Sequence, residues 1–440
     1  MRQGTMVAVV AAGLSLAGCR DRPAPASGIA VDEPRILNPA GAGGAAPMIA
    51  VSAAGVRAFS WLSGLGDGSP NRLFVMTDGR APVELADTLG EFQADRETPP
   101  KLAWAPDGAL HILYAVARTD PGPQAFHAGL RVATSRDTGR TWGPPISVTD
   151  DGALGKYRND HALHVGGDGT IYVSWLDQRT DTIRVFATHS TDGGRTWDTN
   201  RLVDEEGSCE CCRVALTTTR EGRAFLAWRK KLPGGIRDIV VARSDDRGVT
   251  WSAPVRIYAD DWEVGGCPDA GPSLAADDAG RLHVGWWTGK PGAAGVKYAR
   301  SDDGGSTFGA PVVMKIGERS RASHVQVGLG PEKQVVVTWE DGTVEAPRIL
   351  LRASLDGGTT FGPIEALSAE GMVAGYPVVA IRDREFTVLW QEQTPADQAA
   401  HESAAPKDVN WDAMTAPVWR YYNSADRHRV VARTGRLGGG

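Results

Sequence analysis

The chain has few of the features that mark helical, nucleic-acid-binding or membrane-spanning proteins. No part of its 440 residues shows the 3.6-residue apolar period of an α-helix. Lys and Arg form no runs and the net charge is −6, which argues against nucleic acid as a partner. The apolar stretch over Met6–Leu16 is too short to span a bilayer. Abundant instead are glycine, with 54 residues, and tryptophan, with 14, a composition that suits many turns and aromatic anchors.

The N-terminus is typical of an export signal, because Met1-Arg2 precedes the apolar stretch. The stretch ends in Leu16-Ala-Gly-Cys19, which resembles the lipobox of bacterial lipoproteins. That resemblance implies a signal peptide over residues 1–18 and a lipid on Cys19; a plain signal peptide with an incidental cysteine is the alternative. Residues 19–46 are rich in Ala, Gly and Pro and are expected to form a flexible tether. We therefore expect a lipid anchor in the outer membrane of the bacterial cell envelope, with the protein facing the periplasm or the cell surface.

One eight-residue phrase recurs five times. Its copies have Ser first, Asp third, Gly fifth, Thr seventh and Trp or Phe last, and they begin at Ser135, Ser190, Ser244, Ser301 and Ser354. The starts lie 55, 54, 57 and 53 residues apart, a period that indicates a repeat architecture. Ser and Asp can bond backbone N–H groups in a tight turn, Gly permits the turn's conformation, and the aromatic residue anchors the next segment. We interpret the phrase as a structural hairpin turn and not as a catalytic motif.

A second landmark counts the repeats independently. A β-rich run ends in an aromatic residue about six positions after a turn, at Trp61, Tyr114, Trp175, Trp228, Trp286, Trp339 and Trp390. The chain therefore has seven units. The first unit has a worn copy of the phrase at 77–79, and the last has another at 424–426, after an insertion near 394–416. The predicted fold is an all-β propeller of four-stranded blades, with seven blades favoured and six as the alternative.

The phrase is the Asp box, or bacterial neuraminidase repeat, and the chain resembles the sialidase superfamily over residues 47–433. The resemblance implies a β-propeller, followed by a flexible tail at 434–440. Sialidases usually have six blades and carry an arginine triad, a tyrosine nucleophile assisted by a glutamate, and an aspartate acid/base. Their first arginine lies in a Phe/Tyr-Arg-Ile-Pro motif, whereas this chain has Pro34-Arg35-Ile36-Leu37. The scaffold is therefore better preserved than the hydrolase motif.

Four cysteines remain after Cys19. Cys209, Cys211 and Cys212 precede the fourth unit, and Cys267 precedes the fifth. Because neighbouring blades start side by side, the four sulfurs can meet. An exported chain favours two disulfides, with Cys211 or Cys212 bonded to Cys267. A thiolate site for copper or zinc is the alternative; otherwise no cofactor is expected.

The residues at the start of each unit are the candidates for ligand binding. In a propeller these starts share one face, opposite the Asp boxes, and loops on one face of a rigid scaffold concentrate binding groups. The candidate ligand-binding residues are Arg158, Arg213, Arg321, His161, Asp269 and His324. The three arginines suit a carboxylate clamp, because guanidinium groups bind carboxylates bidentately.

Three functions remain open. The favoured one is a membrane-anchored propeller that binds a glycan or another anionic ligand at its mouth. The second is a sialidase-type hydrolase with Tyr376 as nucleophile, Glu340 or Glu392 assisting it and Asp160 as the acid. The third is a copper- or zinc-handling lipoprotein that uses the cysteines.

Overall fold

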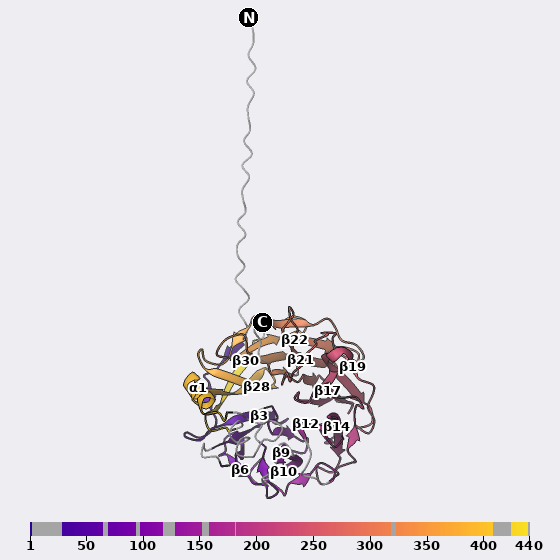
Figure 1. Ribbon diagram of the computed structural model, residues 1–440, viewed down its shortest axis with the longest axis vertical. Coiled ribbons are helices and arrows are strands. Elements are labelled where there is room, and N and C mark those ends of the chain that lie inside the picture. The colour runs from indigo at the N-terminus through magenta and orange to yellow at the C-terminus, as the bar shows by residue number, and fades with distance from the viewer. Residues whose placement is uncertain are drawn as a thin grey trace.

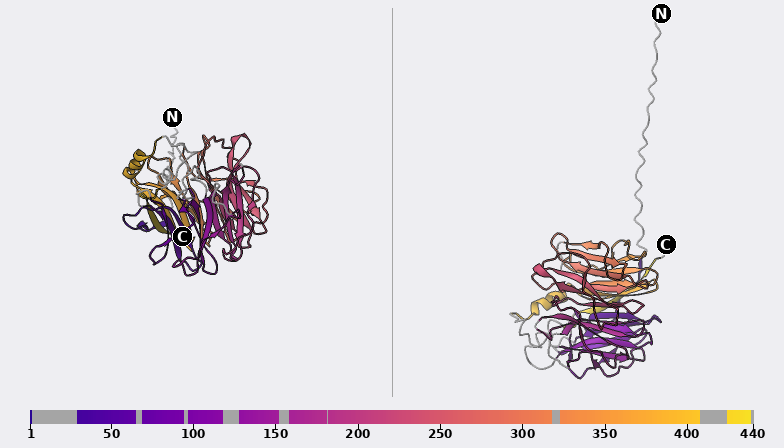
Figure 2. Two further views of the ribbon diagram at one scale, coloured as in Figure 1. Left: turned by 60° about the horizontal axis from the view of Figure 1, so that its bottom comes forward. Right: turned by 90° about the vertical axis from the view of Figure 1, so that its right-hand side faces the viewer.

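The computed structural model is a seven-bladed β-propeller, as the repeats predicted (Figure 1, Figure 2). It describes Met1 and residues 29–64, 69–93, 97–117, 128–151, 158–180, 182–317, 323–407 and 424–438. The first strands of the blades contact one another in order around the ring, and the seventh returns to the first. In Figure 1 the first strands β3 (Ala45–Val51), β12 (Arg158–Val165) and β28 (Val373–Arg382) lie near the centre, while β6 (Val83–Leu85) and β19 (Val255–Arg256) lie at the rim.

The blades follow one another along the chain. Blade one is β3 (Ala45–Val51), β4 (Arg57–Ser63), β5 (Arg72–Thr77) and β6 (Val83–Leu85); blade two is β8 (Lys101–Trp104), β9 (Leu110–Ala117), β10 (Ala128–Ser135) and β11 (Ile146–Ser147), with β7 (Glu91–Phe92) also paired to β9. Blade three is β12 (Arg158–Val165), β13 (Ile171–Asp177), β14 (Arg184–Ser190) and β15 (Arg201–Leu202); blade four is β16 (Ala215–Thr218), β17 (Ala224–Lys231), β18 (Arg237–Ser244) and β19 (Val255–Arg256). Blade five is β20 (Ser273–Ala276), β21 (Leu282–Thr288), β22 (Gly295–Ser301) and β23 (Val312–Ile316); blade six is β24 (Val325–Leu329), β25 (Val335–Asp341), β26 (Arg348–Ser354) and β27 (Glu365–Ala366).

Blade seven closes the ring with strands from both ends of the chain. Its first three strands are β28 (Val373–Arg382), β29 (Glu385–Gln393) and β30 (Arg429–Leu437). The N-terminal strands β1 (Ile29–Val31) and β2 (Arg35–Ile36) add to the outer edge of β30. This corrects two predicted boundaries, because part of the expected tether over 19–46 is paired strand and the expected tail at 434–440 begins inside β30.

The last unit differs from the prediction in two further respects. The residues at 424–426, predicted to be a worn Asp box, precede the third strand β30, whereas the five intact boxes follow the third strands of their blades. The insertion forms α1 (Pro395–Ala404), although the sequence showed no helical period. Local signals start this helix: Thr394 accepts a hydrogen bond from the Asp397 backbone N–H, and Pro395 occupies the first turn. No helix of the described part of the chain is long and apolar enough to cross a membrane.

The five Asp boxes fasten turns, as predicted, and each turn follows the third strand of its blade. In the first copy Ser135 Oγ accepts from the Gly139 N–H at 2.8 Å, and Asp137 Oδ1 accepts from the Thr141 N–H at 2.9 Å. The Thr141 hydroxyl donates to Asp137 Oδ2 at 2.7 Å. The other four copies repeat these bonds. The boxes define one face of the propeller, the box face; the first strands begin on the other, the mouth face.

The core lies mainly between blades and depends on the predicted aromatic landmarks. Each is at most 1% exposed and packs against the preceding blade: Trp61, Tyr114, Trp175, Trp228, Trp286, Trp339 and Trp390. Trp61 of blade one packs against Val378, Leu389 and Val430 of blade seven, at the seam where the ring closes.

Replacing Trp61 by alanine should therefore weaken ring closure. We expect the free energy of unfolding to fall by about 3–5 kcal/mol, as for other buried aromatic-to-alanine changes, measured from urea unfolding curves. Leu355→Ala is the control, because Leu355 is 51% exposed on an Asp-box turn and should change the free energy by less than about 0.5 kcal/mol. A W61A protein as stable as wild type would show that this seam does not hold the ring.

Candidate functional site at the propeller mouth

The first strands enter the mouth with irregular backbone. Asp160, Asp269 and Tyr376 all have positive φ, at 55°, 46° and 57°. The pairing of β12 with β13 shifts register between Asn159 and Ala162, and β28 with β29 shifts between residues 375 and 378. Such bulges redirect side chains and, like positive φ at residues other than glycine, concentrate at functional sites. The entrances of blades three, five and seven are thus built to aim side chains into the mouth.

His324 is the centre of the best-defined cluster in the mouth. Its Nδ1 lies 2.9 Å from Glu340 Oε1, and its Nε2 lies 2.7 Å from Glu97 Oε2 and 3.0 Å from the Asp269 carbonyl oxygen. Burial lowers the pKa of His324, but the two carboxylates outweigh burial and raise it to about 10. The imidazole is therefore a buried cation at neutral pH, and it lowers the pKa of Glu97.

Tyr376 covers this cluster. Its ring stacks on the His324 ring with centroids 4.3 Å apart and planes 25° from parallel. Its backbone N–H donates to Glu340 Oε2 at 2.8 Å, and its hydroxyl donates to Glu97. A Cβ at Gly375 would lie 2.8 Å from Glu340 Oε2, so a side chain there would displace the Glu340 carboxylate. These residues line a cavity of about 290 Å³, whose wall also includes Asp269 and Gln391.

A second group in the mouth surrounds Lys101. Burial and the nearby charge of Arg213 lower the pKa of Lys101 to about 7, against the opposing effects of Asp160 and Glu97. Burial, with help from Lys101, lowers the pKa of His161 to about 3, so this histidine is neutral. Although burial raises the pKa of Glu97, the charges and hydrogen bonds of His324, together with Arg213, bring it below its usual value.

The mouth brings together most, but not all, of the predicted residues. His324, Glu340, Tyr376 and the Asp269 backbone meet directly. Arg213, Asp160 and His161 form the second group with Lys101. Arg321 and the Arg158 side chain lie outside the described residues, so the predicted triad is represented by Arg213 alone.

Two predicted carboxylate roles change in detail. Glu340 accepts a hydrogen bond from the backbone N–H of Tyr376, whereas the Tyr376 hydroxyl is hydrogen-bonded to Glu97. Glu392 is turned to its own blade, where it accepts from Trp390 Nε1 at 2.7 Å and pairs with Arg429.

Glu97 and Lys101 were missed by the sequence analysis. Both lie at the entrance of blade two, in Glu97-Thr-Pro-Pro-Lys101. The repeat register would have pointed to them, because they stand where the other blades carry their mouth residues.

The cysteines form one disulfide and one buried pair of thiols. Cys211 is bonded to Cys267, as one of the predicted alternatives had it. Cys209 and Cys212 are free and buried, with their sulfurs 3.2 Å apart, so the expected second disulfide is not formed. A hydrogen bond from Cys212, with Arg237 and Arg229, lowers the pKa of Cys209 to about 6, whereas burial raises that of Cys212. Because the disulfide uses two of the four sulfurs, a four-thiolate metal site is not present in this state.

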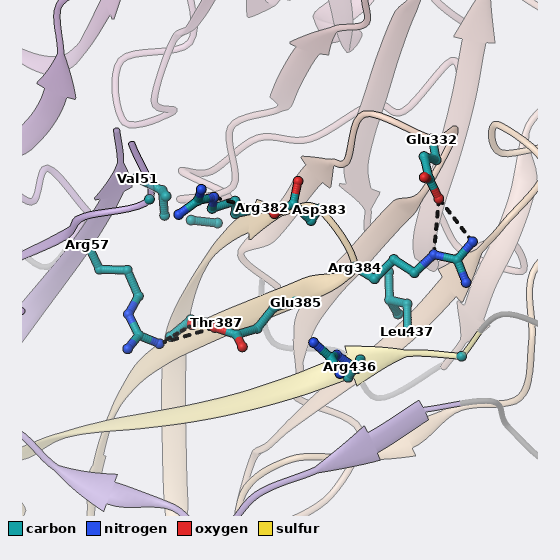
Figure 3. Close-up of a pocket in the computed structure, with 13 residues that line it drawn as sticks. Val51, Arg57, Glu332, Arg382, Asp383, Arg384, Glu385, Thr387, Arg436 and Leu437 are labelled. Carbon is teal, nitrogen blue, oxygen red and sulfur yellow. Dashed lines mark hydrogen bonds and ion pairs between the residues drawn. The ribbon is translucent and has the colours of Figure 1, made fainter. Parts of the chain in front are cut away.

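A larger cavity, of about 710 Å³, opens on the box face between blades one, six and seven (Figure 3). Its arginines are mostly engaged with acidic neighbours: Arg57 pairs with Asp78 and Glu385, and Arg384 pairs with Glu332. Its charges thus largely neutralise one another. The mouth, where buried charges converge on a stacked aromatic ring, is the stronger candidate for a functional site.

Comparison with known proteins supports this fold. The family described as BNR repeat-like domain matches residues 80–264. A protein of unknown function from Dyadobacter fermentans DSM 18053 is 16% identical, with a TM-score of 0.52, over 93% of this chain and 99% of that one. An ulvan lyase of polysaccharide lyase family PL25 is 13% identical, with a TM-score of 0.53, over 80% of this chain and 92% of that one.

A Hadza microbial sialidase is 18% identical, with a TM-score of 0.47, over 78% of this chain and 77% of that one. No curated protein matches the chain. The chain is thus a seven-bladed β-propeller that is similar to BNR-repeat proteins over residues 80–264.

The charge on His324 makes a testable contribution to stability. A folded-state pKa of about 10, above the ordinary value of 6.5, stabilises the fold fully below pH 6.5, and this stabilisation is lost as the pH rises through about 10. The melting temperatures of wild type and His324→Gln should therefore differ most near pH 6 and converge toward pH 10. His283→Gln is the matched control, because the pKa of buried His283 is lowered by burial to about 4. The difference between H283Q and wild type should stay constant between about pH 7.5 and pH 10, because His283 is neutral there in both the folded and the unfolded protein. A constant difference for H324Q over the same range would contradict a charged His324.

Proposed function

We propose that the protein is an envelope-anchored lipoprotein that binds one acidic sugar unit of a glycan at the propeller mouth. The observation that carries the proposal is the cluster of Glu97, His324 and Glu340 beneath the Tyr376 ring. Charged carboxylates accept hydrogen bonds from sugar hydroxyls, and an aromatic face offers an apolar contact beside them. The cavity of about 290 Å³ is at the lower end of ligand-site volumes, which suits a single sugar unit.

The acidic character of the ligand follows from Lys101 and Arg213. Burial and repulsion from the neighbouring charge of Arg213 lower the pKa of Lys101 to about 7, so Lys101 is only partly protonated at neutral pH. A carboxylate or sulfate placed between them would relieve that repulsion and keep Lys101 charged. One structural neighbour with the same type of fold is an ulvan lyase, an enzyme that acts on a polysaccharide. This likeness supports the proposed glycan binding at the level of the fold alone.

A sialidase-type hydrolase is the second candidate, favoured by the hydrogen bond between the Tyr376 hydroxyl and Glu97. In that reaction Glu97 would take the hydroxyl proton as the tyrosine oxygen attacks the anomeric carbon, and Asp160 would protonate the leaving group. The lowered pKa of Glu97 weakens it as a base at neutral pH, since an efficient general base has a pKa near the working pH. Binding is therefore the better-supported function.

Calorimetric titration with 3′-sialyllactose and with a glucuronate-containing disaccharide tests both candidates. Wild type should bind at least one of the two sugars, and Lys101→Gln should bind it roughly tenfold more weakly or worse, because a charged contact of about 1.5–3 kcal/mol is lost. Glu332→Gln, which changes a glutamate of the box face, is the control and should bind like wild type. Wild type that binds neither sugar would contradict the proposal.

Tyr376→Phe separates binding from hydrolysis. The substitution keeps the ring and removes the hydroxyl, so affinity should change only a few-fold. Turnover of a fluorogenic sialoside by wild type, lost in Y376F, would establish the hydrolase instead.

The fold supports an orientation for the proposed anchor. Ile29 pairs with Leu437, whose N–H bonds to the Arg384 carbonyl on the box face. The chain thus joins the propeller on the face opposite the mouth. Nine residues lie between Cys19 and Ile29, and the ten residue-to-residue steps allow a reach of at most about 35 Å. A lipid on Cys19 would hold the box face toward the membrane and leave the mouth open to ligands.

Cys19→Ser tests the anchor in the full-length chain expressed in a bacterial host with a lipoprotein pathway. Wild type should enter the detergent phase of a Triton X-114 separation, and C19S should stay in the aqueous phase, because the acyl chains supply the membrane affinity. Cys212→Ser, which removes a different cysteine, should partition like wild type. Equal partition of C19S and wild type would contradict lipidation of Cys19.

A metal-handling function has one observation in its favour, since the sulfurs of Cys209, Cys211 and Cys212 lie within 4.8 Å of one another. Soft metals bind thiolates, so this function first requires reduction of the Cys211–Cys267 bond. We rank it below glycan binding, and an equivalent of copper or zinc retained by the reduced protein would reverse that ranking.

A further inference from the structure

The four cysteines at the seam between blades four and five form one connected cluster. Cys211 and Cys267 share a disulfide, while the Cys209 sulfur lies 3.9 Å from the Cys211 sulfur and 3.2 Å from the Cys212 sulfur. Cys209 thus stands between a disulfide and a second thiol. This is the arrangement that thiol–disulfide exchange requires, with an attacking thiolate beside a disulfide and a resolving thiol behind it.

We propose that this cluster is an intramolecular thiol–disulfide exchange site, in which Cys209 attacks the Cys211–Cys267 disulfide and Cys212 completes the exchange. In the first step the Cys209 thiolate bonds to the Cys211 sulfur, and the electron pair of the broken bond leaves on Cys267. In the second step Cys212, after losing its proton, bonds to the Cys209 sulfur and displaces Cys211 as a thiolate. The two leaving thiolates take up the protons released by the attacking thiols. One disulfide is made for each one broken, so no external oxidant or reductant is needed.

The surroundings suit each cysteine to its step. Arg237 Nη1 donates to the Cys209 sulfur at 3.2 Å, and a guanidinium contact favours the thiolate, which is the attacking form. Cys267 is exposed, so its leaving thiolate emerges into water. Cys212 is fully buried and has Cys209 as its sulfur neighbour. Glu210, between the cysteines, pairs with Lys231 and Arg237 and ties the loop to blade four while the bonds exchange.

The exchange would alter a link next to the mouth. The Cys211–Cys267 bond joins the entrance loops of blades four and five, whereas a Cys209–Cys212 bond lies within one loop. These loops carry Arg213 and Asp269, whose carbonyl bonds to His324. The state of the cluster therefore decides whether the two loops are covalently tied.

Peptide mapping distinguishes the two states, because trypsin cuts after Arg201, Arg213, Arg256 and Arg281. The resulting peptide 202–213 holds three of the cysteines, and peptide 257–281 holds Cys267. The full-length protein is incubated at pH 8 for increasing times, quenched in acid, unfolded, alkylated with N-ethylmaleimide near pH 6.5 and digested. Protein purified without free thiols first receives one equivalent of dithiothreitol, which produces the two-thiol state.

Wild type should yield both the cross-linked pair of peptides and a fraction of 202–213 with an internal bond, accompanied by alkylated Cys267. Cys209→Ser should yield the cross-linked pair alone, because the attacking sulfur is missing. Cys212→Ser should stop after the first step, with a Cys209–Cys211 bond and alkylated Cys267. Wild type that remains fully cross-linked at all times would overturn the proposal, and this outcome decides the question even if a variant fails to fold.

Discussion

Closure of the ring by interblade aromatic packing is the constraint on which the rest of this structure depends. A single four-stranded blade leaves both faces of its sheet to be covered, and the buried aromatic side chain of each second strand packs against the preceding blade. The first blade has no earlier neighbour in the sequence, so Trp61 must pack against the last blade. The N-terminal strands β1 and β2 reinforce that seam by completing the seventh sheet around β30.

The closed ring makes the mouth possible. Glu97 comes from the entrance of blade two and Tyr376 from that of blade seven, and both meet His324 of blade six. Charged groups are costly to bury unless they are paired and hydrogen-bonded. Here one imidazolium satisfies two carboxylates, and a backbone N–H at a strained bulge supplies a further bond. The mouth is thus a preorganised polar site held by the rigidity of seven sheets, while the Asp boxes hold the turns of the opposite face.

The predictions held where the signal was local and repeated. The five boxes placed the turns after the third strands, and the aromatic landmarks placed the second strands and the number of blades. The errors lie where the repeat is broken: the insertion forms α1 through its capping residues, and residues 424–426 precede β30. The N-terminal strands were assigned to a tether because two short strands with exposed side chains carry no pattern that distinguishes them from a linker. They are strands because the edge of β30 is there to pair with them.

The sequence by itself determined the architecture of this protein. An Asp box is held by hydrogen bonds among residues at most four apart, and a blade is a succession of hairpins, so local chemistry repeated along the chain is enough to specify them. Only the tertiary structure decided which entrance residues meet and which sulfurs are bonded. Glu97 and His324 are 227 residues apart, and Cys211 and Cys267 are 56 apart. Their contacts depend on the angles between blades in the closed ring, and no short stretch of sequence encodes those angles.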